Sequence, residues 1–209
     1  MRYSRDQSEF DRAIAFLDAT FALALTLLVT TIELDVSHSV WESLGNLDDS
    51  LGTPLVAFGI AFAIIANFWL INHRMVASFA AIDYPVIVAF LFLIAAIVLL
   101  PFSTEAVGEP GLGDLPLPTA VMAINVAAAA ILTGFLYWLA WKRDLLEPRP
   151  DRDEVSFRLL SSAVPAAIFL GSIPIAYLVS PDAAQVSWIS LIVVGRIFDP
   201  ERRAKRKSK

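Results

Sequence analysis

Residues 10–34 read FDRAIAFLDATFALALTLLVTTIEL, an apolar stretch whose first half is interrupted by Arg12 and Asp18. A membrane-crossing helix needs about 20 predominantly apolar residues, so this stretch is long enough to span a bilayer. A signal peptide has a shorter apolar region and no early carboxylate within it. We therefore expect residues 10–34 to be retained as the first membrane span.

The rest of the chain divides by the same criterion. Five more apolar runs are expected to be spans: 53–76, 85–102, 119–141, 157–179 and the short 185–198. Of the 209 residues, 57% are hydrophobic and 18% are charged, and the mean hydropathy is +0.65, which excludes a water-soluble domain. The expected fold class is all-α: an integral membrane six-helix bundle in a single transmembrane domain over residues 1–209, with a basic cytoplasmic tail at 199–209.

The charges are divided between the two sides of these spans. Of the 16 Lys and Arg residues, three precede or open the first span, one ends the second, five lie between the fourth and fifth, and seven end the chain, so all fall on one side. The loops of the other side hold carboxylates only: Glu33, Asp35, Glu42, Asp48, Asp49, Glu105, Glu109, Asp114 and Asp182. The positive-inside rule then places both termini in the cytoplasm of a multi-pass cell-membrane protein. The acidic loops either attract cations or are simply polar, and the basic tail is expected to anchor the chain to membrane lipids and not to bind nucleic acid.

The residues needed for several kinds of chemistry are missing from the sequence. There is no cysteine and there are two histidines, His38 and His73. The HExxH, GxSxG and Gly-rich phosphate-loop motifs are absent, as is the Thr-Val-Gly-Tyr-Gly carbonyl filter. We expect no enzyme activity, no catalytic residue, no cofactor and no metal site beyond a permeating ion.

The first span has one face that could line a pore. At about 100° per residue, Leu23, Leu27 and Thr30 lie on one uncharged face, which is extended by Phe16, Thr20 and Leu34. Several copies around an axis would form two rings of leucine and one of threonine, giving a hydrophobic gate beside hydroxyls that replace water around a cation. Packing against lipid or another helix is the alternative for this face.

The order of residues in this span resembles the first helix of the transmembrane protein 175 family of potassium-selective channels. The family hallmark Arg-x-x-x-Phe-Ser-Asp is met at Arg12, Phe16 and Asp18, whereas Leu17 stands in place of the serine. Two later segments also match family motifs: FWLINHRMV, with Trp69 and His73, and the triplet Pro101, Phe102 and Ser103.

The resemblance implies a homotetrameric potassium channel without a carbonyl selectivity filter, modestly selective for K+ over Na+ among monovalent cations. It implies that Leu23, Leu27 and Thr30 line the pore, which aliphatic rings close. It also implies a structural network that clamps the first helix to the second, made of Arg12, Phe16, Asp18, Trp69 and His73.

Two other functions stay open from the sequence. A secondary transporter or proton-coupled carrier would need broken helices near the bilayer midplane, for which Pro165, Gly171 and Pro174 are the only hint. A membrane scaffold without transport would need no midplane charge. Single-channel current steps would separate a channel from both.

Overall fold

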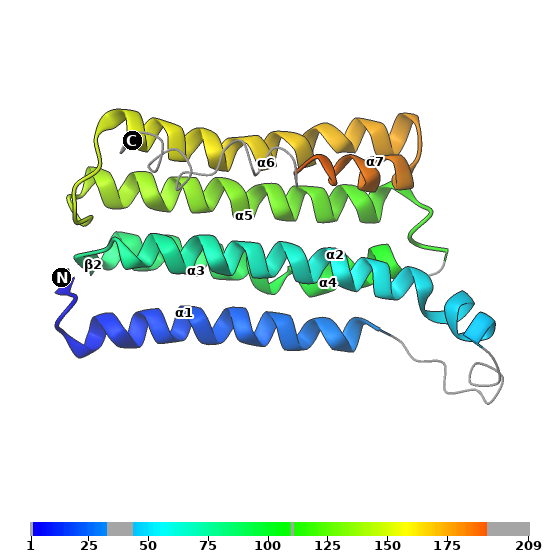
Figure 1. Cartoon of the computed structure of the whole chain (residues 1–209), viewed down its shortest axis with the longest axis horizontal. Helices are drawn as coiled ribbons and strands as arrows, with labels where there is room; N and C mark the ends of the chain where they lie inside the picture. The colour runs from blue at the N-terminus through cyan, green and yellow to red at the C-terminus, as the bar shows by residue number, and fades with distance from the viewer. Residues whose placement is uncertain (1, 33–43, 110, 192–209) are drawn as a thin grey trace, which may run out of the picture.

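The computed structural model describes residues 2–32, 44–109 and 111–191. Long helices run side by side in three layers (Figure 1). Helix α1, Ser8–Leu27, forms one outer layer and continues into the 3-10 turn η1, Leu28–Thr31. The middle layer holds α2 (Leu44–Ala77), α3 (Tyr84–Val98) and α4 (Leu100–Gly108), and the far layer holds α5 (Pro116–Lys142), α6 (Arg152–Leu178) and α7 (Pro181–Ser187).

Five helical segments are long and apolar enough to cross a membrane: Ser8–Thr31, Pro54–Ala77, Tyr84–Gly108, Pro116–Lys142 and Arg152–Leu178. They confirm the predicted class of a helical membrane bundle. The expected sixth span, 185–198, overlaps the end of α7 and otherwise lies outside the described residues, as does the basic tail.

The third span is longer than expected and is divided in two. It continues past residue 102 to Gly108, and α3 gives way to α4 at Leu99. Pro101 follows two residues later, and proline can donate no backbone hydrogen bond to the preceding turn. The hydroxyls of Ser103 and Thr104 both donate to the Leu100 carbonyl, at 3.0 and 2.8 Å, so these polar groups are satisfied within the apolar layer.

A small β-structure, which the sequence reading did not predict, closes one end of the bundle. Strand β1 (Arg2–Ser4) pairs antiparallel with β2 (Ala81–Asp83). The α5–α6 turn joins them, because the Ala80 N–H donates to the Leu145 carbonyl and the Glu147 N–H to the Ser78 carbonyl, each at 2.8 Å. We call residues 2–5, 78–83 and 143–147 the basal clasp.

Asp83 connects three parts of the basal clasp. One carboxylate oxygen caps α3 by accepting the Val86 N–H at 3.2 Å, and the other accepts a hydrogen bond from Nε of Arg143 at the end of α5. Its backbone pairs with Arg2 in the strand before α1. The clasp therefore fixes the first residues of α1 to the α2–α3 and α5–α6 turns.

Helices α5 and α6 pack closely because α5 presents small residues. A Cβ on Gly134 would lie 2.9 Å from the Cβ of Ser162, so only glycine fits at this contact. Helix α6 runs without a break through both Pro165 and Pro174. The broken helix that Pro165, Gly171 and Pro174 could have indicated is therefore absent from α6.

Candidate ion pathway

Helix α1 has one buried face and one exposed face in the single chain. The buried face carries Leu17, Phe21, Ala24 and Leu28, none more than 3% exposed. This spacing of four, three and four residues is that of one helix face, and the face packs against α2, α3 and α4. The neighbouring layers therefore fix the rotation of α1 about its own axis.

The residues predicted to line a pore lie on the other face. Leu23 is 54% exposed and Leu27 is 38% exposed, and Thr30 is exposed as well. Thr31 is half-buried, so Thr30 is the threonine that shares the exposed face with the leucines. In a bilayer such a face is covered by lipid, by another subunit or by a water-filled pathway.

The threonine hydroxyls of α1 and η1 donate hydrogen bonds to backbone carbonyls. Thr30 donates to the Leu27 carbonyl at 2.6 Å, and Thr26 and Thr20 donate to carbonyls of the preceding turn, each at 2.8 Å. A hydroxyl has one proton and two lone pairs. These oxygens therefore offer acceptor capacity to their surroundings, which suits a cation or a water molecule.

Asp18, Trp69 and His73 lie together where α1 meets α2. The indole Nε1 of Trp69 donates to the Asp18 carboxylate at 3.0 Å, and the Trp69 and His73 rings are 5.3 Å apart between centroids. A hydrogen bond to an ionised acceptor is stronger than one between neutral groups. This contact ties the middle of α1 to the last third of α2.

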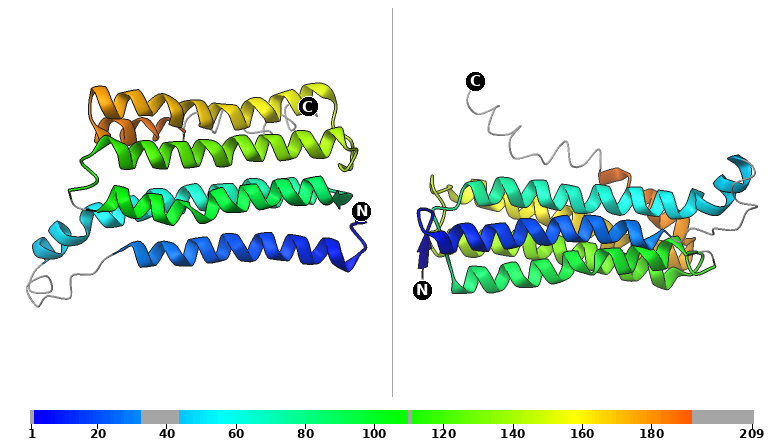
Figure 2. Two further views of the ribbon diagram at one scale, coloured as in Figure 1. Left: turned by 180° about the vertical axis from the view of Figure 1, so that it is seen from behind. Right: turned by 90° about the horizontal axis from the view of Figure 1, so that it is seen from below.

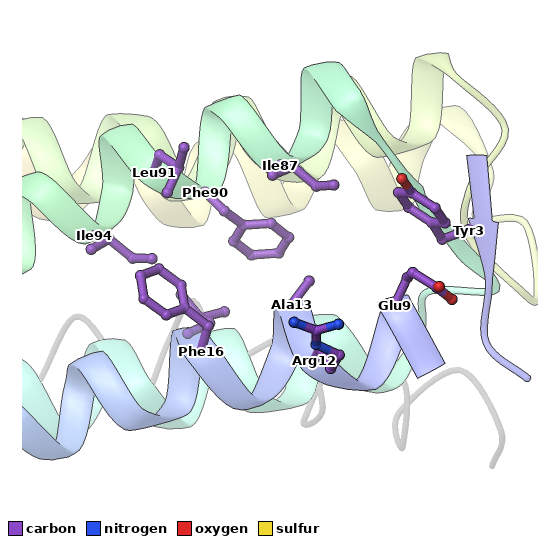
Figure 3. A pocket seen from close by; sticks show the side chains of 10 residues that line it. Tyr3, Glu9, Arg12, Ala13, Phe16, Ile87, Phe90, Leu91 and Ile94 are labelled. Atoms are coloured by element: carbon purple, nitrogen blue, oxygen red, sulfur yellow. The ribbon is translucent and has the colours of Figure 1, made fainter. Parts of the chain in front are cut away.

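Arg12 and Phe16 lie elsewhere. They line a cavity of about 330 Å³ between α1 and α3, in which Figure 3 shows Phe16, Phe90 and Ile94 turned toward the space between the two helices. The other lining residues are Tyr3, Glu9, Ala13, Leu17, Ile87 and Leu91. We call this space the α1–α3 cavity.

The five residues expected to form one network are thus divided between two places within the chain. The helix itself explains the division, since Asp18 is two residues beyond Phe16 and lies about 200° around the axis from it. Arg12 and Phe16 are four residues apart and share a face. Applying the same angular spacing to this motif would have predicted the division.

Asn72 on α2 is a buried polar residue to which the sequence assigned no role. The Asn72 side chain is buried on α2, one turn beyond Phe68, to whose carbonyl it donates at 3.0 Å. Within the described ranges no group of three or more His, Asp or Glu residues is arranged to hold a metal ion.

Comparison with known proteins places this arrangement in a family. A family model described as the endosomal/lysosomal potassium channel TMEM175 matches residues 12–101, from the start of the α1 motif to Pro101. A potassium channel of Chamaesiphon minutus is 32% identical over 158 residues, which cover 72% of this chain and 75% of the relative. The chain belongs to the TMEM175 family. A potassium channel of Streptomyces collinus is 27% identical over 150 residues, covering 69% of this chain and 71% of that protein.

Solved structures of TMEM175 proteins have the same fold. The crystal structure of a lysosomal potassium-selective channel TMEM175 homolog from Chamaesiphon minutus superposes with a TM-score of 0.72 at 25% identity, covering 92% of this chain and all of that one. A variant of the potassium channel MtTMEM175, bound to a nanobody fusion, superposes with a TM-score of 0.61 at 18% identity, covering 93% and 94%. TMEM175 is a family of channels and not of enzymes.

Proposed function

We propose that this TMEM175 protein is the subunit of a homotetrameric cation channel that favours K+ over Na+, with α1 lining the pore. The observation that carries the proposal is the division of α1 into two faces. Leu17, Phe21 and Ala24 are buried within the subunit, whereas Leu23 and Leu27 are exposed at successive turns. Four such helices around an axis form aliphatic rings that close the pathway by excluding water.

The polar groups along α1 support the same function. The hydroxyl of Thr30 follows the Leu27 ring by one turn and presents lone pairs, because its proton is bound to a backbone carbonyl. Few other fixed oxygens line this face, so discrimination depends mainly on the cost of removing water from the ion. This cost is higher for Na+ than for K+, and the expected selectivity is therefore modest.

The distribution of charge supports an orientation with both termini in the cytoplasm of a cell-membrane protein. Within the described ranges, every Lys and Arg lies at the end of the bundle that holds the basal clasp. The opposite end carries Glu105, Glu109, Asp114 and Asp182. By the positive-inside rule the clasp is cytoplasmic, and the acidic outer end raises the local concentration of cations.

The proposal is tested by the reversal potential of purified protein in a planar bilayer with K+ on one side and Na+ on the other. Leu27→Ala is the informative variant, and Leu170→Ala on α6 is its control, since the two leucines are similarly exposed at 38% and 42%. We expect the wild-type potential to shift toward the K+ equilibrium value. Leu27→Ala should raise the conductance and reduce the shift, whereas Leu170→Ala should change neither.

Three results would contradict the proposal. Absence of current through folded wild-type protein would exclude a channel, and saturable flux without current steps would indicate a carrier. Equal behaviour of Leu27→Ala and wild type in a conducting protein would show that α1 does not form the narrow part of the pathway.

A further inference from the structure

The α1–α3 cavity is apolar over most of its wall and open at its side. Phe16 on α1 and Leu91 on α3 both line it and both remain largely exposed in the single chain. Phe16 also lies on the same exposed strip of α1 as Leu23 and Leu27, so the cavity adjoins the proposed pore-side face. Its walls come from α1, α3 and Tyr3 of β1, and a further element is needed to close its open side.

The order of the helices around α1 indicates which element this is. Figure 2 shows α1 between α2 on one flank and α3 on the other, with α5 and α6 behind them. If α1 faces a central axis, as the proposed function requires, each subunit presents α2 on one side and α3 on the other. Identical subunits that close a ring meet through unlike surfaces, so α2 of one subunit lies against α3 of the next.

The outward face of α2 carries small residues followed by one bulky leucine, and this leucine lies at the level of the cavity along the bundle. Gly59, Ala63 and Leu70 are exposed on this face, and no described atom lies within 4 Å of where a side chain on Gly59 would begin. Small residues let membrane helices approach closely, and Leu70 is the bulky residue that follows them. Leu70 follows Trp69, which donates a hydrogen bond to Asp18. Asp18 is the neighbour of the cavity residue Leu17, so Leu70 and the cavity lie at the same level along the bundle.

Charged residues lie at the basal end of both surfaces. Arg74 is exposed one turn beyond Leu70 on α2, and the cavity wall carries both Glu9 and Arg12. Seating Leu70 in the cavity brings the Arg74 guanidinium to this end, where Glu9 attracts it and Arg12 repels it, so the contact depends mainly on the apolar wall. We propose that the α1–α3 cavity is a socket for Leu70 of the partner subunit, which locks α2 of one subunit against α1 and α3 of the next.

Paired cysteines test this contact, because the natural chain has no cysteine. We would combine Leu70→Cys with Leu91→Cys, oxidise the purified protein with copper phenanthroline and separate the products on a denaturing gel. The double variant should give a ladder up to the covalent tetramer. Neither single variant should cross-link. Co-expressed single variants should give covalent dimers only, since each subunit then carries one cysteine and can form one disulfide. The matched control combines Leu70→Cys with Leu170→Cys on α6 and should give no ladder.

The outcomes separate this inference from the proposed function on which it rests. Native mass spectrometry and K+ conductance of the unmodified parent report tetramer formation and channel activity. A conducting tetramer whose double variant gives no ladder, or retains a phospholipid bound in place of the leucine, would overturn the socket alone. Cross-linking of either single variant would show a contact between like surfaces and overturn it too, whereas a silent, monomeric parent would overturn both.

Discussion

The Asp83–Arg143 pair gives a prediction whose size follows from burial. The Asp83 side chain is 7% exposed and the Arg143 side chain is 42% exposed. Asp83→Asn keeps an oxygen that can accept the Val86 N–H and so preserves the α3 cap, because asparagine is as good an N-cap as aspartate. The substitution therefore keeps the cap but removes the charge attraction and the hydrogen bond from Arg143 Nε, because the Asn amide nitrogen that replaces the second oxygen cannot accept one.

The expected cost lies between two limits. Removing one partner of a fully buried pair costs about 3–5 kcal/mol, and exposed pairs contribute about 0.2–1 kcal/mol. Arg143 keeps part of its contact with water, so we expect a loss of about 1–2 kcal/mol in the free energy of unfolding. This corresponds to a change of roughly 5- to 30-fold in the folding equilibrium constant.

The assay is equilibrium unfolding in mixed micelles, followed by tryptophan fluorescence. Arg149→Gln is the matched control, because it breaks the pair between Arg149 and Asp144 of the same clasp, where the side chains are 60% and 63% exposed. The control should lose about 0.5 kcal/mol or less. The double variant Asp83→Asn with Arg143→Gln should cost little more than the larger single change. Equal losses for Asp83→Asn and Arg149→Gln would refute the reasoning, because burial would then have no influence on the value of the pair.

Three further substitutions have expected outcomes. Asp18→Leu leaves the Trp69 indole N–H without its acceptor and should reduce the tetramer fraction on size exclusion, whereas Asp18→Asn should retain more tetramer; an Asp18→Asn tetramer with altered ion preference would contradict this structural role. Gly134→Ala forces Ser162 away and should lower the midpoint of thermal unfolding; an unchanged midpoint would show that the helices separate freely. Phe21→Ala empties a fully buried position and should cost about 3–5 kcal/mol, measured by the same micelle titration, with a loss under 1 kcal/mol excluding a packed core there.

Much of the fold could be predicted because its determinants are local along the chain. A bilayer requires each span to satisfy its own backbone, so a long apolar run specifies a helix wherever it occurs. The same local logic predicted the exposed strip of Leu23, Leu27 and Thr30, since positions on one helix have fixed angles to each other. The separation of basic from acidic loops also required only the order of the spans.

The tertiary structure alone decided how these helices meet. Asp83 and Arg143 are 60 residues apart, and no local sequence pattern around either residue predicts that they form a pair. Likewise, the burial of the Phe21 face set the rotation of α1, which directed Asp18 to Trp69 and left Phe16 at the α1–α3 cavity. Periodicity specifies which residues share a face, but only packing between distant segments determines which neighbour that face contacts.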